Sequence, residues 1–174
     1  DARGGLLIQD ENDIYLRNTL QFLINCCDPY YDDEHNQVVG DLCHMQTIQL
    51  RQMDILKKED ICEYSLVGNL CSGEYFSANT FRFLVEWDPH SLVQPNVFGS
   101  IPLHYASAWS SSHSFQTVFE TGIMYYPHKK GISLLFTKAT TGGKTAFQYA
   151  CENYGWDTAI DVVEDTITRY YSEE

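Results

Sequence analysis

The stretch NVFGSIPLHYAS, residues 96 to 107, decides the fold together with its second copy TTGGKTAFQYAC, residues 140 to 151. Both follow the frame Gly-x-[Thr/Ile]-[Pro/Ala]-[Leu/Phe]-[His/Gln]-Tyr-Ala. In each copy a glycine that is free to take a positive φ precedes a short helical pattern. Pro102 is suited to a first helical turn and Thr145 to a helix cap, whereas Ile101 has no hydroxyl with which to cap. An internal repeat of this kind predicts stacked copies of one unit.

A second helical pattern follows each copy. After the first, one stripe comprises Phe115, Val118, Phe119, Gly122 and Ile123. After the second, the apolar residues are Ala159, Ile160, Val162 and Val163. We therefore expect pairs of antiparallel helices, with Leu103, Phe147 and Val163 buried between adjacent pairs.

A degenerate copy covers residues 65 to 92. Its first helix is expected to contain Ser65, Val67 and Leu70, and its second helix Phe81, Leu84 and Val85, ending at Pro89. The repeats then begin at residues 65, 101 and 145, so the second spacing is the longer one. We assign the excess to an insertion near residues 125–136, expected to be an extended finger or an irregular loop.

The repeated frame resembles the ankyrin-repeat family. Residues 101 to 106 are similar to that family's Thr-Pro-Leu-His-x-Ala helix opening, with Ile101 in place of Thr, and residues 145 to 150 are a more divergent copy. Gly155-Trp156 stands where the family has Gly-His. More narrowly, the combination of YYPHKKGISLLF, KTAFQYACENYG and VVEDTI resembles ankyrin-like proteins of diatoms and related algae, a similarity that covers about residues 52 to 170. The resemblance implies an all-α helix-turn-helix repeat solenoid with short β-turn or hairpin connections, a protein-binding role and no catalytic residues.

Residues 1–58 lack the frame and are expected to form a helical N-terminal segment, either a divergent repeat or a cap. Residues 59–174 then hold the three ankyrin-like repeats. In the N-terminal segment one helix is expected around Ile14, Leu16, Leu20, Leu23, Ile24 and Cys27. A polar connection over residues 28–36 leads to a second helix from Val38 to Arg51.

The charge of the chain argues against two classes of partner. Asp and Glu number 24 against 11 Lys and Arg, which gives a net charge of −13. Nucleic acid and anionic membranes require a basic footprint, so neither is expected as a partner. No signal peptide or membrane-spanning segment is expected. Six cysteines without CxxC spacing predict reduced thiols and an intracellular, cytoplasmic location.

Gly143-Lys144-Thr145 ends like a nucleotide-binding phosphate loop, but position 138, where that loop needs its first glycine, holds Lys138. We therefore expect Gly142-Gly143 to form a tight turn. His104 and Cys151 could be a catalytic base and nucleophile, although structural roles are favoured because nothing orients the base. The acidic residues between Asp28 and His35 lack calcium-loop spacing and are expected to form a solvated loop. No catalytic residue, cofactor or metal is predicted.

The ankyrin resemblance implies which residues face a partner. Matched position by position, they are Val97, Phe98, Ser100, Ala108, Trp109, Thr141, Gly142, Lys144, Glu152 and Asn153. Phe98 and Trp109 are the expected anchors, and the alternative is that both rings pack under residues 125–136.

The function expected is a protein-binding scaffold without catalysis, and the net charge favours a basic protein as the partner at low salt. One alternative is a nucleotide-dependent or Cys/His hydrolytic enzyme, and another is a structural spacer in a longer protein.

Overall fold

A computed structural model describes residues 3, 5–12, 17–25, 32–73, 75–139 and 141–171, and over these ranges the secondary structure is helical, with two isolated β-bridges and no strand. The α-helices are α1 (Thr19–Ile24), α2 (Asp33–Gln52), α3 (Lys58–Glu63), α4 (Leu66–Cys71), α5 (Ala78–Trp87), α6 (Pro102–Trp109), α7 (Ser112–Tyr125), α8 (Lys129–Ser133), α9 (Ala146–Tyr154) and α10 (Trp156–Tyr171). Two 3-10 helices are η1 (Pro89–Leu92) and η2 (Leu134–Phe136). The prediction of an all-α chain is confirmed.

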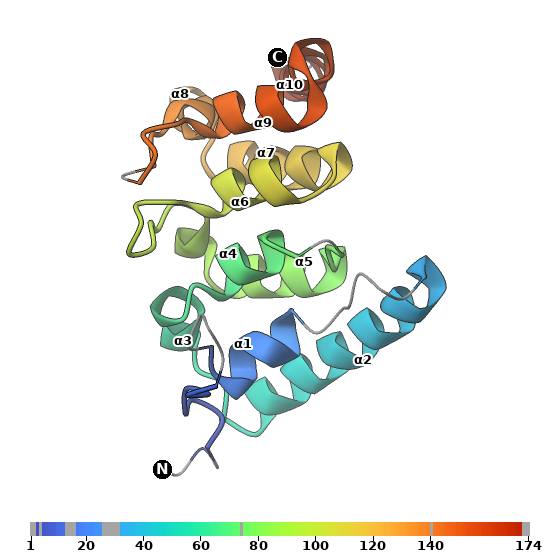
Figure 1. Ribbon diagram of the computed structural model, residues 1–174, viewed down its shortest axis with the longest axis vertical. Coiled ribbons are helices and arrows are strands. Elements are labelled where there is room, and N and C mark those ends of the chain that lie inside the picture. The colour runs from blue at the N-terminus through green and yellow to red at the C-terminus, as the bar shows by residue number, and fades with distance from the viewer. Residues whose placement is uncertain are drawn as a thin grey trace.

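The helices lie in layers along the long axis of the molecule (Figure 1). The short helices α4, α6 and α9 are stacked one above another, and α6 contacts both of the others. Each is followed in the chain by a longer helix that packs against it, namely α5, α7 and α10. The N-terminal residues lie at one end of the stack and α10 at the other.

The two copies of the repeated frame begin their helices as the sequence predicts. Pro102 is the first residue of α6, and Ile101 before it makes no side-chain cap hydrogen bond. Thr145 caps α9 by accepting a hydrogen bond from the backbone N–H of Gln148, whose side-chain oxygen accepts from the Thr145 N–H in return. This reciprocal pair satisfies two of the N–H groups that a helix start leaves without intrahelical partners.

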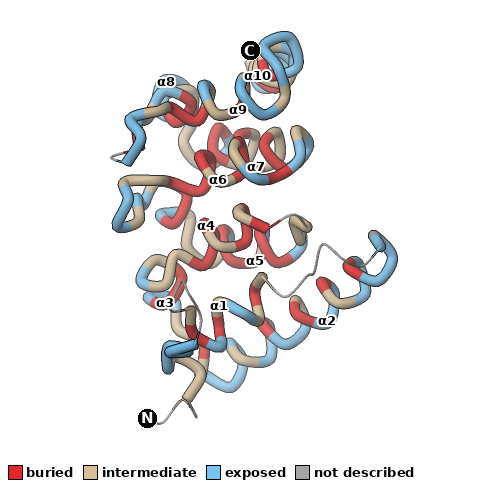
Figure 2. Tube along the Cα trace, viewed as in Figure 1, coloured by how far each residue is buried: buried red, intermediate tan, exposed pale blue. Residues whose placement is uncertain are grey.

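The core runs through the stack between the layers (Figure 2). All five residues of the predicted α7 stripe are buried, as are Phe81, Leu84 and Val85 of α5. Leu103 is 2% exposed. Phe147 and Val163 are only partly buried, so that part of the core prediction is wrong. Both belong to the α9/α10 layer, and no further described layer covers it.

Side-chain hydroxyl groups of the second and third layers donate hydrogen bonds to the carbonyl groups that end α4 and α6. The Ser110 hydroxyl lies 2.8 Å from the Cys71 carbonyl and 3.1 Å from the Gly73 carbonyl, where α4 ends. The single proton of the Tyr154 hydroxyl is shared between two carbonyls at the end of α6, whose oxygens lie 2.7 Å (Ala106) and 2.8 Å (Ser110) from the hydroxyl oxygen. Terminal carbonyls of a helix need such external donors, so each layer depends on the following one.

Residues 125–136 are not an extended finger, which corrects the sequence prediction. They contain the end of α7, all of α8 and η2. Leu134 and Leu135 are buried, and a Cβ at Gly131 would lie 2.4 Å from the Tyr126 carbonyl oxygen. Apolar burial and this close backbone approach fold the insertion onto α7 as compact helical turns.

The N-terminal segment is helical where it is described. The predicted helix from Val38 to Arg51 lies within α2, but α2 begins earlier than expected because Asp32 caps it by accepting from the His35 N–H. The last residues of the expected polar connection are therefore helical. The predicted first helix is observed as α1, capped by Asn18. Ile14, Leu16 and Cys27 lie outside the described residues.

The cysteines are not all thiols. Cys62, Cys71 and Cys151 are free, whereas Cys43 is disulfide-bonded. The expectation of reduced cysteines throughout is therefore wrong at Cys43, and the argument it gave for a reducing compartment loses its basis. In the part of the chain that is described, no helix combines the length and hydrophobicity needed to cross a membrane.

Candidate interaction surface

The turn before α6 is organised by Asn96. Its side-chain oxygen accepts hydrogen bonds from the N–H groups of Phe98 and Ser100, both at 3.0 Å, and its amide donates to the Tyr105 hydroxyl at 2.6 Å. Gly99 has φ 70°, a value that glycine adopts at little cost. The side chain of one residue thus ties the turn to α6 and holds Phe98 in place.

The turn before α9 is a short hairpin closed by a bridge between Lys138 and Thr145. Gly142 and Gly143 have φ values of 82° and 64°, which confirms the predicted glycine turn. The Thr141 N–H donates to the Phe98 carbonyl at 3.1 Å. This backbone hydrogen bond joins the two turns into one continuous edge.

Large apolar side chains on this edge face solvent. Val97 is 92% exposed, Phe98 55% and Trp109 67%. Neither aromatic ring is buried under residues 125–136, so the alternative considered from the sequence does not hold. Phe98 lies in the turn before α6 and Trp109 is the last residue of α6, so the two rings mark opposite ends of this helix.

The other predicted partner-facing residues differ in solvent exposure and in the contacts that their side chains make. Thr141, Gly142 and Glu152 are exposed, and Ser100 and Ala108 are half-buried. Lys144 contacts the Glu152 carboxylate at 2.7 Å and lies over the Tyr149 ring. Asn153 is exposed, yet its amide donates to the carbonyls of Ser107 and Ser110 at the end of α6. Asn153 therefore also serves the packing of α9 on α6.

The short helices carry almost no charge. In α4, α6 and α9, every residue of which is described, Glu152 is the only Asp, Glu, Lys or Arg, and Lys144 neutralises it. The acidic side chains lie elsewhere, for example at Asp157, Asp161 and Glu164 on the exposed side of α10. The short helices are therefore nearly neutral and rich in aromatic groups, although the chain is strongly acidic, and the exposed Lys138 lies in the turn before α9.

His104 is a structural residue of this edge. Its Nδ1 accepts from the Ile101 N–H at 3.1 Å, which leaves the proton on Nε2 to donate to the Thr137 carbonyl at 2.9 Å. Burial lowers the pKa of His104, and the hydrogen bond to Thr137 opposes this more weakly. Both ring nitrogens are occupied, as expected for a histidine that connects α6 to the start of the next hairpin.

Cys151, the second residue of the enzymatic alternative, is a half-buried thiol. Burial raises the pKa of this thiol, whereas a catalytic cysteine needs a lowered one. Within the described ranges, no group of three or more His, Cys, Asp and Glu side chains could hold a metal ion.

Asn96 and Tyr105, which fix the first turn, were not among the residues predicted from the sequence. An Asn three residues before Gly99 is a typical start of a turn closed by the Asn side chain, and that signal could have identified it. No protein-family model matches the chain, and neither the curated proteins nor the solved structures give a match.

Proposed function

We propose that the chain is a protein-binding scaffold with an ankyrin-like repeat solenoid, and that the edge of turns and short helices is its binding surface. The observation that carries this proposal is the exposure of Phe98 and Trp109 on a framework whose turns are fixed by hydrogen bonds. Aromatic residues dominate the energetics of interfaces, and a framework that is already ordered loses little entropy when it binds.

The surface chemistry favours a partner segment that is neutral at the contact. Such a segment would place apolar side chains against Phe98 and Trp109 and hydrogen-bond with Thr141 and Ser100. The net charge of −13 still attracts a basic protein at long range, which affects the association rate more than the contact itself. Added salt is then expected to slow association and to leave dissociation nearly unchanged.

Phe98→Ala and Trp109→Ala test the surface once an affinity pull-down has supplied a partner. Each change is expected to weaken binding by about 2 kcal/mol or more without lowering the melting temperature, because both rings are exposed. Trp156→Ala is a matched control, since Trp156 is 61% exposed on α10, outside this surface. Equal affinities for all three variants would contradict the proposed surface.

The alternative function, a nucleotide-dependent enzyme, can be distinguished from the proposed scaffold by a nucleotide-binding test. At the start of α9 the N–H groups of Thr145 and Gln148 each donate to the other residue's side chain, and Lys144 is paired with Glu152, so a phosphate that used these groups would have to displace both arrangements. We expect ATP with magnesium to leave the melting temperature unchanged. A saturable rise that Lys144→Ala abolishes would favour the enzyme. If no partner is found, the spacer role in a longer protein becomes the better account.

A further inference from the structure

Helix α2 exposes three large apolar side chains to solvent. Val38, Leu42 and Met45 are each 55% exposed. The opposite side of the helix is buried at Asn36, Gly40, Cys43 and Thr47, and Leu50 on that side is partly buried against the core. A surface helix of a globular domain ordinarily turns such an apolar stripe towards the core. The exposed stripe therefore needs an explanation beyond the packing of this chain.

The spacing of the exposed residues matches a coiled-coil seam. Leu42 follows Val38 by four residues and Met45 follows Leu42 by three, and this 4-3 spacing is the heptad pattern of a and d positions. In this register Glu34 and Asp41 occupy two successive g positions, and both are exposed. Residues at g flank the seam and select the partner helix by charge.

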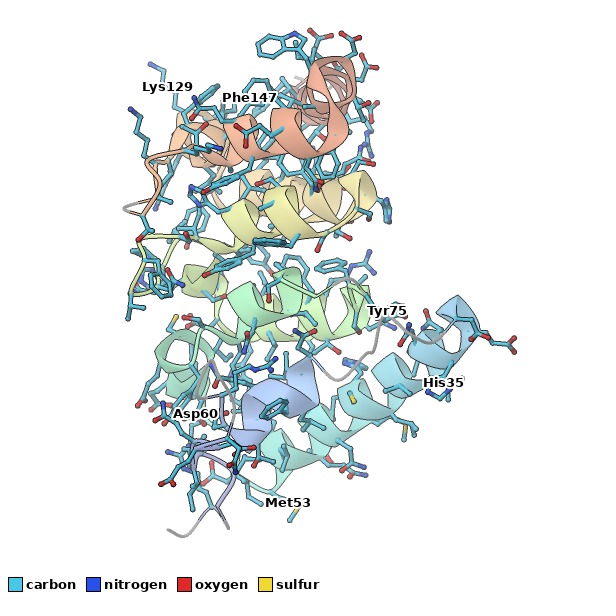
Figure 3. All side chains as sticks on the ribbon, in the orientation of Figure 1. His35, Met53, Asp60, Tyr75, Lys129 and Phe147 are labelled. Atoms are coloured by element: carbon cyan, nitrogen blue, oxygen red, sulfur yellow. The ribbon has the colours of Figure 1, made fainter. Side chains whose placement is uncertain are left out.

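The acidic edge of the seam has no basic residue of α2 beside it. Arg51 is the only Lys or Arg in α2, and it lies over the Trp87 ring on the side that packs against α5. Asp41 accepts a hydrogen bond from the neutral Gln37 side chain. The N-terminal half of α2 extends past the edge of the stack, and His35 projects away from the body there (Figures 1 and 3).

We propose that the Val38-Leu42-Met45 seam docks a basic amphipathic helix of another protein, with aliphatic residues on the seam and Lys or Arg facing Glu34 and Asp41. Charge complementarity argues for this occupant over a second copy of the chain. In an antiparallel pair of α2 helices, Glu34 and Asp41 of one copy would face the same acids of the other. In a parallel pair they would face Val39 and Gln46, which offer no opposite charge. This surface is separate from the turn surface and independent of the function proposed for it.

The probes for a binding test are two synthetic 21-residue helical peptides, both with Leu at every a and d position. One carries Lys at all e and g positions and the other Glu. Fluorescence anisotropy of the labelled peptides should show saturable binding of the Lys peptide to the whole chain and none of the Glu peptide. Leu42→Gln should weaken binding of the Lys peptide at least 10-fold, and Val97→Gln, at a 92% exposed position on the turn surface, should not change it.

Reversing the charge of the edge separates specific docking from general attraction to an acidic protein. Glu34→Lys combined with Asp41→Lys should transfer the preference to the Glu peptide, whereas Asp161→Lys combined with Glu164→Lys on α10 should leave the Lys peptide bound. If both double variants behave alike, the proposal fails. Sedimentation that shows a dimer of the chain, lost in Leu42→Gln, would assign the seam to a second copy and would also overturn it.

Discussion

At the scale of single residues, position 143 requires glycine because of its backbone conformation and not because neighbouring atoms leave no space for a side chain. Its φ is 64°, and an added Cβ would meet no atom within 4 Å. Gly143→Val should therefore destabilise the fold by about 1 to 3 kcal/mol through backbone strain alone, as measured by urea denaturation. Gly143→Asn should be nearly neutral, because Asn tolerates the left-handed region. Equal losses for the two variants would mean that side-chain contacts determine the effect.

Lys144, the next residue in the same motif, is expected to contribute much less to stability than Gly143. Its ion pair with Glu152 joins two side chains that are both about half exposed to water. Pairs of this kind add little to stability because solvent screens them. Lys144→Ala should leave the midpoint of urea denaturation nearly unchanged, and a loss as large as that of Gly143→Val would contradict a surface role.

His104 links stability to pH. Its folded-state pKa lies below the ordinary value of 6.5, so the unfolded chain takes up this proton first as the pH falls. The stabilising contribution is complete above about pH 6.5 and is lost as the pH decreases towards the folded-state pKa. His104→Gln places here the residue that Gln148 provides in the next repeat, and it should reduce the difference in melting temperature between about pH 7.5 and pH 5. His113→Gln, at an exposed position, should preserve the difference.

At the scale of helices, the hydroxyl cap that Thr145 provides to α9 can be tested by substitution. Thr145→Ala removes the acceptor of the Gln148 N–H and should cost about 1 kcal/mol of unfolding free energy. Thr145→Ser keeps the hydroxyl and should recover most of this loss. Identical losses for Ala and Ser would assign the effect to the buried methyl group of Thr145.

The sequence predicted those helices whose pattern repeats. The starts of α6 and α9 were predictable because Pro102, Thr145 and the adjacent glycines act locally. The helical form of residues 129–136 was not, since it depends on contacts of Gly131 with Tyr126 and Ile123 that only the folded chain brings together. The early start of α2 depends on Asp32, one acid among several in that stretch, so composition alone suggested a loop.

At the scale of the whole molecule, the position of a residue along the stack should determine how much unfolding free energy is lost when its side chain is truncated to Ala. Leu103 lies between layers and is 2% exposed, whereas Val163 belongs to the last described layer and is partly buried. Leu103→Ala should cost about 2 to 5 kcal/mol and Val163→Ala about 1 kcal/mol, as measured by denaturant unfolding. If Val163→Ala cost as much as Leu103→Ala, some further group would have to cover the last layer.

The sequence left two alternatives for Phe98 and Trp109, exposure on a partner-facing surface or packing under residues 125–136, and the structure shows both rings exposed. The frame could not decide between them, because it does not show how residues 125–136 fold. The overall charge suggested an acidic surface, but the short helices are neutral, and a net charge does not say where on a fold the charges lie. The seam on α2 consists of only three apolar residues at heptad spacing. The same spacing occurs in many buried helices, so the sequence alone did not predict that this side of α2 is exposed.

The dependence of each layer on the next has a consequence for synthesis on the ribosome. The carbonyls that end α4 receive their hydrogen bonds from Ser110, which lies 39 residues after Cys71. At common elongation rates that interval lasts about 2 to 8 s. We therefore expect the carbonyls at the end of the nascent α4 to be hydrated during this time, and those at the end of α6 until Tyr154 emerges. On this expectation the layers are completed in one direction, from the N-terminus, at the pace of translation.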